Sequence, residues 1–293
     1  MIKSDARDGT TIRYPSIANL MIDSADRNEI NYPNANNFAI QRPYSLLNGI
    51  FTRVATTEVV LEWDTPNFGP AGFTGTIQYS TPADQYSLVL PPGFYTVEEA
   101  IHLLVGLLNS ESATSDITWV LTANPIGGAI LTQSGAGVGD VTIAQNPADV
   151  PNLIEKLFGS VAIASTGIAN PLTTLTTAVD LRPYRYIDMV SPSLTYSQDV
   201  KDASSAEVVR DVLCRWYFDY DEQNMIDGYG YPILMGYKPF CLRRIFNPPK
   251  QIRWDANLPV AGIMNFALYD PFGKLVETVN STNFLMTLQV SEN

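Results

Sequence analysis

The feature that most limits the fold of this chain is its division into many short strand-like runs by proline and glycine. The 293 residues include 20 Pro and 19 Gly, together with 15 Tyr and 12 Phe. Runs rich in β-branched and aromatic residues that stop at such positions are typical of strands joined by turns. The runs before residue 91 are 20–22, 38–40, 50–63, 73–79 and 85–90, and those after residue 181 are 184–190, 208–218, 239–246, 251–254, 262–269 and 283–290. The outer parts of the chain therefore supply enough strands for an eight-stranded β-sandwich.

The clearest helix signal lies between these two sets of strands, at residues 97–109. Thr96 is a good N-cap, and Glu99 follows three residues later, which completes a capping box. Apolar residues then recur at helical spacing until Asn109, where we expect the helix to end. Short strand-like pieces at 117–122, 129–132 and 141–144 and a second short helix at 151–158 follow.

Charge sets this middle region apart. Between Gly93 and Asp180 there are eight acidic residues and one basic residue, Lys156, for a net charge of −7. A block of one charge sign flanked by mixed charge indicates a separate module. We interpret residues 93–180 as an inserted acidic α+β domain, residues 20–92 and 181–293 as the larger β domain, and residues 1–19 as a polar N-terminal arm. The alternative is a single domain with an acidic face.

Composition narrows the possible classes of protein. The net charge is −12 and the pI is near 4.4, which disfavours non-specific nucleic-acid binding because phosphate contacts need clustered Lys and Arg. Charged residues make up only 16%, as expected for a subunit that buries surface against neighbours; a compact secreted-type β protein is the alternative.

The opening residues are too polar for a signal peptide, and no apolar run is long enough to cross a membrane. We therefore expect assembly in a reducing interior, with Cys214 and Cys241 as buried thiols and no disulfide.

The sequence offers few candidates for chemistry. His102 is the one histidine, and its place among helical leucines predicts a half-buried structural residue. The run Ser134–Asp140 has the wrong glycine spacing for a phosphate loop, which predicts a turn between strands. The acidic run Asp219–Gly228 lacks the ligand and glycine spacing of a calcium loop, which favours a solvated loop. We therefore assign no catalytic, cofactor-binding or metal-binding residue, and we do not expect an enzyme.

One basic stretch stands out, from Lys238 to Arg253. Its five cations and three aromatic residues are Lys238, Arg243, Arg244, Lys250, Arg253, Phe240, Phe246 and Trp254. Basic and aromatic residues together can bind single-stranded nucleic acid. Because the whole chain is acidic, we favour a contact with the acidic edge of a neighbouring subunit, in which charge mainly sets the register.

Four stretches, in order along the chain, resemble the penton or minor capsid proteins of virophages, polinton-like viruses and nucleocytoplasmic large DNA viruses. They read MIDSADRNEINYPNANNFAI, DQYSLVLPPGFYTVEEAIHLLVGLLN, YIDMVSPSLTYSQDVKDASS with VLCRW, and PPKQIRWDANLPVAGIMNFALYDPFGKLV. They cover about a third of the chain. The sequence departs from this pattern at Tyr269–Phe272, before Gly273, where a more polar turn is expected.

This resemblance implies a mainly β chain with a single jelly-roll β-sandwich and a smaller inserted α+β domain. It implies five upright copies at each vertex of an icosahedral shell of a double-stranded DNA virus or virophage, assembled inside the host cell. The implied partners are four identical subunits, a double jelly-roll major capsid protein and other minor capsid proteins. Whether the inserted domain also reaches a host receptor is left open by the resemblance. It leaves contact with a membrane open.

Three alternatives remain open at this point. The chain could be a minor or cement protein that lies between major capsomers. It could be a viral carbohydrate-binding or receptor-binding β protein, because aromatic faces stack on sugars. A hydrolase that uses Asp or Glu is motivated only by the surplus of carboxylates.

Overall fold

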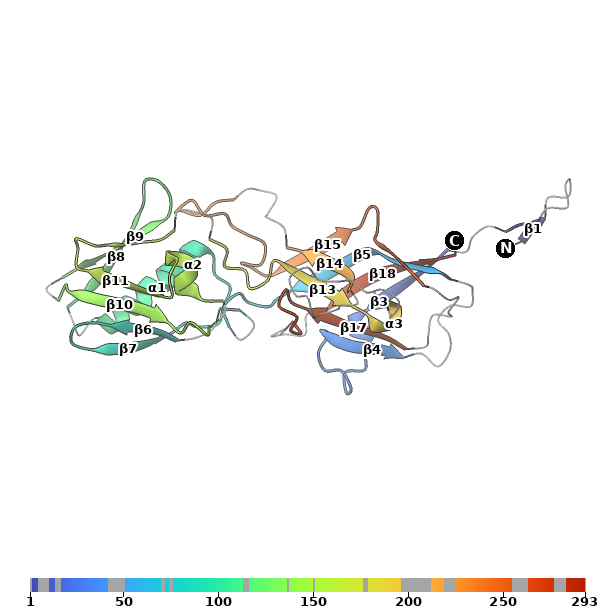
Figure 1. Ribbon diagram of the computed structural model, residues 1–293, viewed down its shortest axis with the longest axis horizontal. Coiled ribbons are helices and arrows are strands. Elements are labelled where there is room, and N and C mark those ends of the chain that lie inside the picture. The colour runs from blue at the N-terminus through green and yellow to red at the C-terminus, as the bar shows by residue number, and fades with distance from the viewer. Residues whose placement is uncertain are drawn as a thin grey trace. The chain divides into compact units, whose positions relative to one another are not determined.

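The computed structural model describes most of the chain, which divides into two compact units (Figure 1). The described residues are 2–4, 11–13, 17–41, 51–69, 72–73, 76–112, 116–135, 137–149, 151–175, 179–195, 212–218, 225–254, 263–276 and 283–292. Unit 1 comprises Met1–Trp63, Tyr186–Tyr217 and Cys241–Asn293, and unit 2 comprises Asp64–Arg185 and Phe218–Phe240. The chain therefore enters unit 2 twice.

The described residues of unit 1 form two main antiparallel sheets, besides a short two-stranded pair near the N-terminus. The first has the order β15-β5-β18-β3, and β16 also pairs with β5. Its strands are β3 (Ile17–Asp23), β5 (Arg53–Trp63), β15 (Phe240–Ile245), β16 (Gln251–Arg253) and β18 (Phe284–Ser291). The second sheet has the order β14-β13-β17-β4. Its strands are β4 (Asn37–Gln41), β13 (Tyr186–Val190), β14 (Val212–Tyr217) and β17 (Ile263–Tyr269).

The order of these strands is that of a jelly roll. Counted from β3, and with β15 and β16 taken as one interrupted strand, the first sheet holds the first, third, sixth and eighth strands of unit 1. The second sheet holds the second, fourth, fifth and seventh strands. Two interlocked Greek keys produce this alternation between sheets. The fold is therefore mainly β, with a single jelly-roll sandwich, as predicted.

Alternating burial fixes which face of each strand lies inside the sandwich. Along β18, every second side chain from Phe284 to Val290 is buried. The ring of Phe284 lies 5.7 Å from the ring of Phe38 and 5.6 Å from that of Trp216, measured between centroids. Because Phe38 and Trp216 come from the other sheet, these aromatic contacts join the two layers.

The described residues of unit 2 form two small sheets and two helices. One sheet has the order β11-β10-β6-β7 and the other the order β12-β9-β8. The strands are β6 (Thr76–Ser80), β7 (Gln85–Val89), β8 (Thr118–Ala123), β9 (Ala129–Ser134), β10 (Asp140–Gln145), β11 (Ala162–Thr166) and β12 (Leu172–Thr173). Helix α1 (Val97–Ser112) contacts β7 and β8, and α2 (Leu153–Phe158) contacts β10 and β11.

The capping box of α1 is confirmed. The Thr96 backbone N–H donates to Glu99 Oε2 at 2.7 Å, and the Glu99 N–H donates to Thr96 Oγ1 at 3.2 Å. The predicted end at Asn109 is wrong, because the helix continues to Ser112. The Asn109 side chain accepts from the Trp119 N–H and donates to the Trp119 carbonyl, so it binds β8 instead of capping the helix.

The limits of unit 2 differ from the predicted 93–180. It begins at Asp64, because the β6–β7 hairpin pairs with β10 of this unit and not with the jelly roll. It also includes Phe218–Phe240, where the buried Tyr231 and Tyr237 hydroxyls donate to the Leu175 and Val179 carbonyls. Neither pairing is visible as a local pattern, because each joins segments that are far apart in the sequence.

One further boundary needs correction. The predicted arm 1–19 overlaps β3, which starts at Ile17, and within the arm β1 (Ile2–Ser4) pairs with β2 (Thr11–Arg13). The interval between the predicted strands 184–190 and 208–218 begins with a short helix, α3 (Pro192–Thr195). The Ser191 carbonyl accepts hydrogen bonds from the Leu194 and Thr195 N–H groups, which closes that turn.

We expect Phe284→Ala to lower the free energy of unfolding of unit 1 by about 4 kcal/mol, because it removes the ring that joins the two sheets and leaves a cavity. Phe272→Ala is the matched control, since the Phe272 side chain is 68% exposed. We expect that change to cost under about 0.5 kcal/mol. Urea denaturation followed by tryptophan fluorescence measures both, and equal losses would contradict the described core.

Candidate assembly and binding surfaces

The residues that the sequence analysis weighed as candidates for chemistry lie at the following places in the structure. His102 is more exposed than predicted, at 57% of its side chain, because it lies on the outer face of α1. Its Nε2 lies 4.0 Å from Glu98 Oε1 and 3.5 Å from the Tyr229 hydroxyl. The loop Ser134–Asp140 connects β9 and β10, as predicted. Gly135 has φ +110°, and a Cβ there would lie 2.1 Å from the Asp116 carbonyl oxygen, so only glycine fits this turn.

The two cysteines are both free. Cys214 is buried, as predicted, and burial raises the pKa of its thiol to about 12. The Trp216 indole N–H donates to its Sγ at 3.1 Å. Cys241 is exposed, which corrects the prediction that both thiols are buried, because it lies on the outward face of β15.

The acidic run Asp219–Gly228 falls partly outside the described residues, which resume at Met225. Asp227 accepts three backbone N–H bonds, from Glu98 at 3.1 Å, Tyr229 at 3.0 Å and Tyr231 at 2.9 Å. It therefore ties this segment to the start of α1. Within the described ranges, no group of three or more His, Cys, Asp or Glu residues could hold a metal ion. No described helix is both long and apolar enough to span a bilayer.

A pocket of about 730 Å³ opens beside the start of α1, entirely within unit 2. It combines aromatic side chains, an imidazole, three carboxylates and one amine. Its lining is Phe94, Tyr95, Thr96, Glu98, Glu99, His102, Leu103, Ile226, Asp227, Gly228, Ile233 and Lys238. A volume of this size suits a small ligand.

The stretch MIDSADRNEINYPNANNFAI, the first of the four quoted above, forms the connection between β3 and β4 around a buried arginine. The Arg27 guanidinium is 4% exposed and donates to four oxygens: Ser24 O, Tyr32 O, Pro33 O and Asn283 Oδ1. These distances range from 2.9 Å to 3.2 Å. A buried cation is tolerated only where such acceptors replace water. The motif therefore shapes this connection and ties it to the start of β18.

A second pocket, of about 710 Å³, lies against this connection. It is lined by β4, by the exposed Ile263 at the start of β17 and by polar residues of the connection. The lining residues are Asp26, Asn28, Asn31, Tyr32, Ala39, Ile40, Gln41 and Ile263.

Sequence reasoning missed an ion pair on the outer face of the second sheet. Arg215 binds Asp188 through Nε–Oδ1 at 2.6 Å and Nη2–Oδ2 at 2.9 Å, and the Asp188 side chain is fully buried. The guanidinium carbon lies 3.9 Å from the centroid of the Tyr186 ring. The hydrogen bonds that Arg215 donates to the Asp188 carboxylate raise the pKa of Arg215 above its ordinary value. The only sequence signal was the spacing of Asp188 and Arg215 in two strand-like runs.

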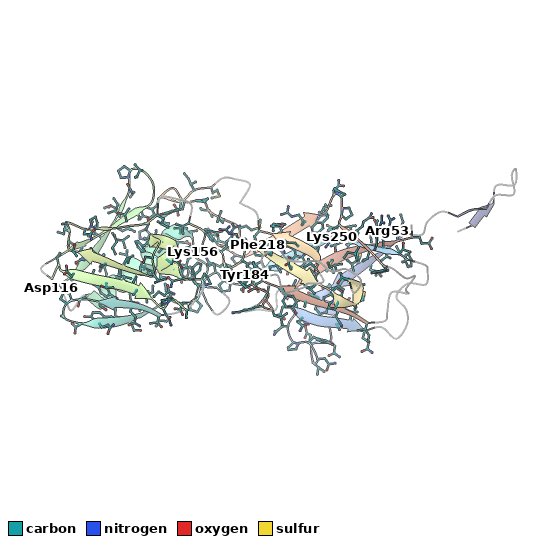
Figure 2. All side chains as sticks on the ribbon, in the orientation of Figure 1. Arg53, Asp116, Lys156, Tyr184, Phe218 and Lys250 are labelled. Carbon is teal, nitrogen blue, oxygen red and sulfur yellow. The ribbon has the colours of Figure 1, made fainter. Side chains whose placement is uncertain are left out.

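The basic stretch is divided between the two units. Lys238 and Phe240 belong to unit 2, and Arg243 to Arg253 belong to unit 1, where Figure 2 labels Lys250. Arg243 binds Glu58 at 2.6 Å, Arg244 donates to the Tyr217 carbonyl, and Lys250 donates to the Val212 carbonyl, the last two at 3.2 Å. Burial lowers the pKa of Lys250. Arg243, Arg244 and Lys250 thus have partners within the chain, and the contact with a neighbouring subunit stays a prediction.

Charge is unevenly divided between the two units. Unit 2 holds 14 Asp and Glu against four Lys and Arg, so it carries −10 of the chain's −12. Unit 1 holds 16 acidic against 14 basic residues. The acidic character predicted for the inserted region therefore extends over the whole of unit 2.

We expect Arg27→Met to lower the free energy of unfolding of unit 1 by about 3 kcal/mol, because it removes the guanidinium that donates to four oxygens in this buried connection. Glu29→Gln is the control, since Glu29 is 72% exposed and lies 3.6 Å from Arg27. That change is expected to cost under about 0.5 kcal/mol. The readout is again urea denaturation by tryptophan fluorescence, and a stable Arg27→Met variant would show that the arginine does not organise this connection.

The two thiols are expected to react at very different rates. Iodoacetamide at mildly alkaline pH should alkylate Cys241 in the native protein and Cys214 only after denaturation, because the thiolate is the reactive form and burial suppresses it. Peptide mass spectrometry identifies the labelled residue, and Cys241→Ser should leave the native protein unlabelled. Labelling of native Cys214 at a comparable rate would contradict its described burial.

Comparisons with known proteins found likeness in structure and none in sequence. The sequence matches no protein-family model and no curated protein. Among solved structures, the chain is similar to the crystal structure of the mavirus penton protein, with 12% sequence identity and a TM-score of 0.48. The likeness covers 95% of this chain and 99% of that protein.

Proposed function

We propose that this chain is a structural capsid protein that forms the pentameric vertex of an icosahedral double-stranded DNA virus or virophage shell. The observation that carries this proposal is the jelly-roll strand order of unit 1, with unit 2 formed by the segments between β5 and β13 and between β14 and β15. Jelly rolls are common among viral capsid domains, although the fold alone does not define a function. The ordered resemblance of four sequence stretches to capsid vertex proteins adds the specificity that the fold lacks.

The physical properties of the two units suit that role. A jelly roll is a rigid body, and fivefold closure needs one flank of each copy to complement the other flank of the next. Unit 1 is close to neutral, so five copies can approach without strong repulsion. Five copies of unit 2, at −10 each, repel one another and are best placed where solvent separates them.

A receptor-binding role is the second candidate function. It is favoured by the pocket beside α1, where Tyr95 and His102 offer rings and Glu98 offers a carboxylate. Aromatic and carboxylate side chains together suit a sugar, so a glycan array is the direct test. Retained glycan binding by a His102→Ala variant would remove this pocket from consideration.

We expect the purified protein to form a closed pentamer whose fraction rises with salt. The reason is that repulsion between the acidic units acts over long range, and the Debye length falls from about 10 Å at 0.1 M to about 3 Å at 1 M. Light scattering on a sizing column at several salt concentrations measures this. If the protein stays monomeric, co-assembly with the major capsid protein is the next test. It distinguishes a vertex protein that forms pentamers only within the shell from a cement protein. A protein that neither forms pentamers nor co-assembles would contradict the capsid proposal.

A further inference from the structure

Strand β4 has an open edge in the described part of the structure. It pairs with β17 on one side, and no described strand pairs with its other side. The Leu268 N–H donates to the Asn36 carbonyl, so residues 36 and 268 form a hydrogen-bonded pair. Hydrogen-bonded and non-hydrogen-bonded pairs alternate in an antiparallel ladder. The N–H and C=O groups of Asn37, Ala39 and Gln41 therefore point away from β17, toward the open edge.

The opposite edge of the same sheet is protected. Strand β14 lies there, and two cations donate to its carbonyls: Arg244 to Tyr217 O and Lys250 to Val212 O. Long cationic side chains commonly blunt sheet edges against further pairing. No cation donates to the β4 backbone in the described residues. The edge at β14 is therefore covered by cationic side chains, and the edge at β4 is not.

The pocket of about 710 Å³ lies beside this open edge. Its lining includes Ala39 and Gln41, two of the residues whose backbone groups face outward. Asp26 and Tyr32 also line it, and the Asp26 carboxylate has no partner among the described residues. A carboxylate and a phenol ring together suit a basic side chain. An open strand edge next to a side-chain pocket is the arrangement that binds an extended peptide by strand addition.

We propose that the edge of β4 and the adjoining pocket bind an extended segment of another protein, which adds a strand to the second sheet and inserts a lysine or arginine between Asp26 and Tyr32. Backbone hydrogen bonds to Ala39 supply affinity, and the pocket supplies the preference for a basic residue. The site lies wholly in unit 1. It does not depend on the capsid role.

The test uses the full chain and a fluorescent peptide of about seven residues, a typical strand length, that alternates valine and threonine around a central arginine. Saturable binding by fluorescence anisotropy is expected, weakened about tenfold when the central residue is glutamate. Ala39→Pro should also weaken binding about tenfold, because it removes an outward N–H without breaking the ladder with β17. Asp26→Asn should reduce the preference for arginine over glutamate. Ile30→Ala is the matched control, since Ile30 is 94% exposed and does not line the pocket.

Three results would overturn the proposal. The first is the absence of saturable binding, and the second is equal binding by the Ala39→Pro variant with its fold intact. The third is a change in the oligomeric mass of Ala39→Pro without peptide, which would show that a second copy occupies the edge. If Ala39→Pro does not fold, peptides N-methylated at alternate positions test the same hydrogen bonds on the unmodified protein. Equal affinity of both N-methylated registers and the parent peptide would then exclude strand addition.

Discussion

The fold of unit 1 depends on β18, the strand that closes its first sheet. β18 pairs with β3 on one side and with β5 on the other, along nearly its whole length. Its first residue, Phe284, also donates its N–H to Ser24 Oγ at 2.8 Å, across 260 positions in the sequence. Contacts of such separation carry a large loop-closure entropy, so they form only when the intervening chain is already compact. The jelly roll is therefore completed by its last strand, and Arg27 couples the β3–β4 connection to the same point through Asn283.

This dependence on distant pairing explains what the sequence could and could not predict. Most strand positions were predicted because burial on one face imposes a local alternation, as in β18. The start of α1 was predicted because the capping box is local. The membership of β6 and β7 in unit 2 was not predicted, because nothing in residues 73–90 shows that they pair with β10. The return of the chain to unit 2 at Phe218–Phe240 was not predicted either, because it also depends on contacts between residues far apart in the sequence.

Side-chain roles were harder to predict than elements, for a related reason. The sequence marks Arg27 as part of a motif but does not show that its acceptors come partly from residue 283. The Asp188–Arg215 pair requires the register of β13 against β14, which places the two residues directly opposite each other. The basic stretch from Lys238 to Arg253 is continuous in sequence, but its cations belong to two different units and have different partners. Cations that are close in sequence therefore need not lie on one surface, whereas the pairing register of two strands determines which of their residues are neighbours.

The hydrogen bonds of Arg244 and Lys250 indicate a role for these cations within unit 1. Arg244 and Lys250 bind carbonyls of β14, and the register of β13 and β14 directs the Tyr217 carbonyl toward the free side of that strand. Their positive charge therefore contributes to keeping β14 from pairing with another chain, at an edge that would otherwise invite association. A subunit that must form ordered contacts has reason to close some edges and leave others available. In its described residues, unit 1 combines an edge at β14 that two cations cover with an unpaired edge at β4 beside the pocket that Asp26 lines. Under the proposed strand addition, these cations direct a further strand to β4 and away from β14.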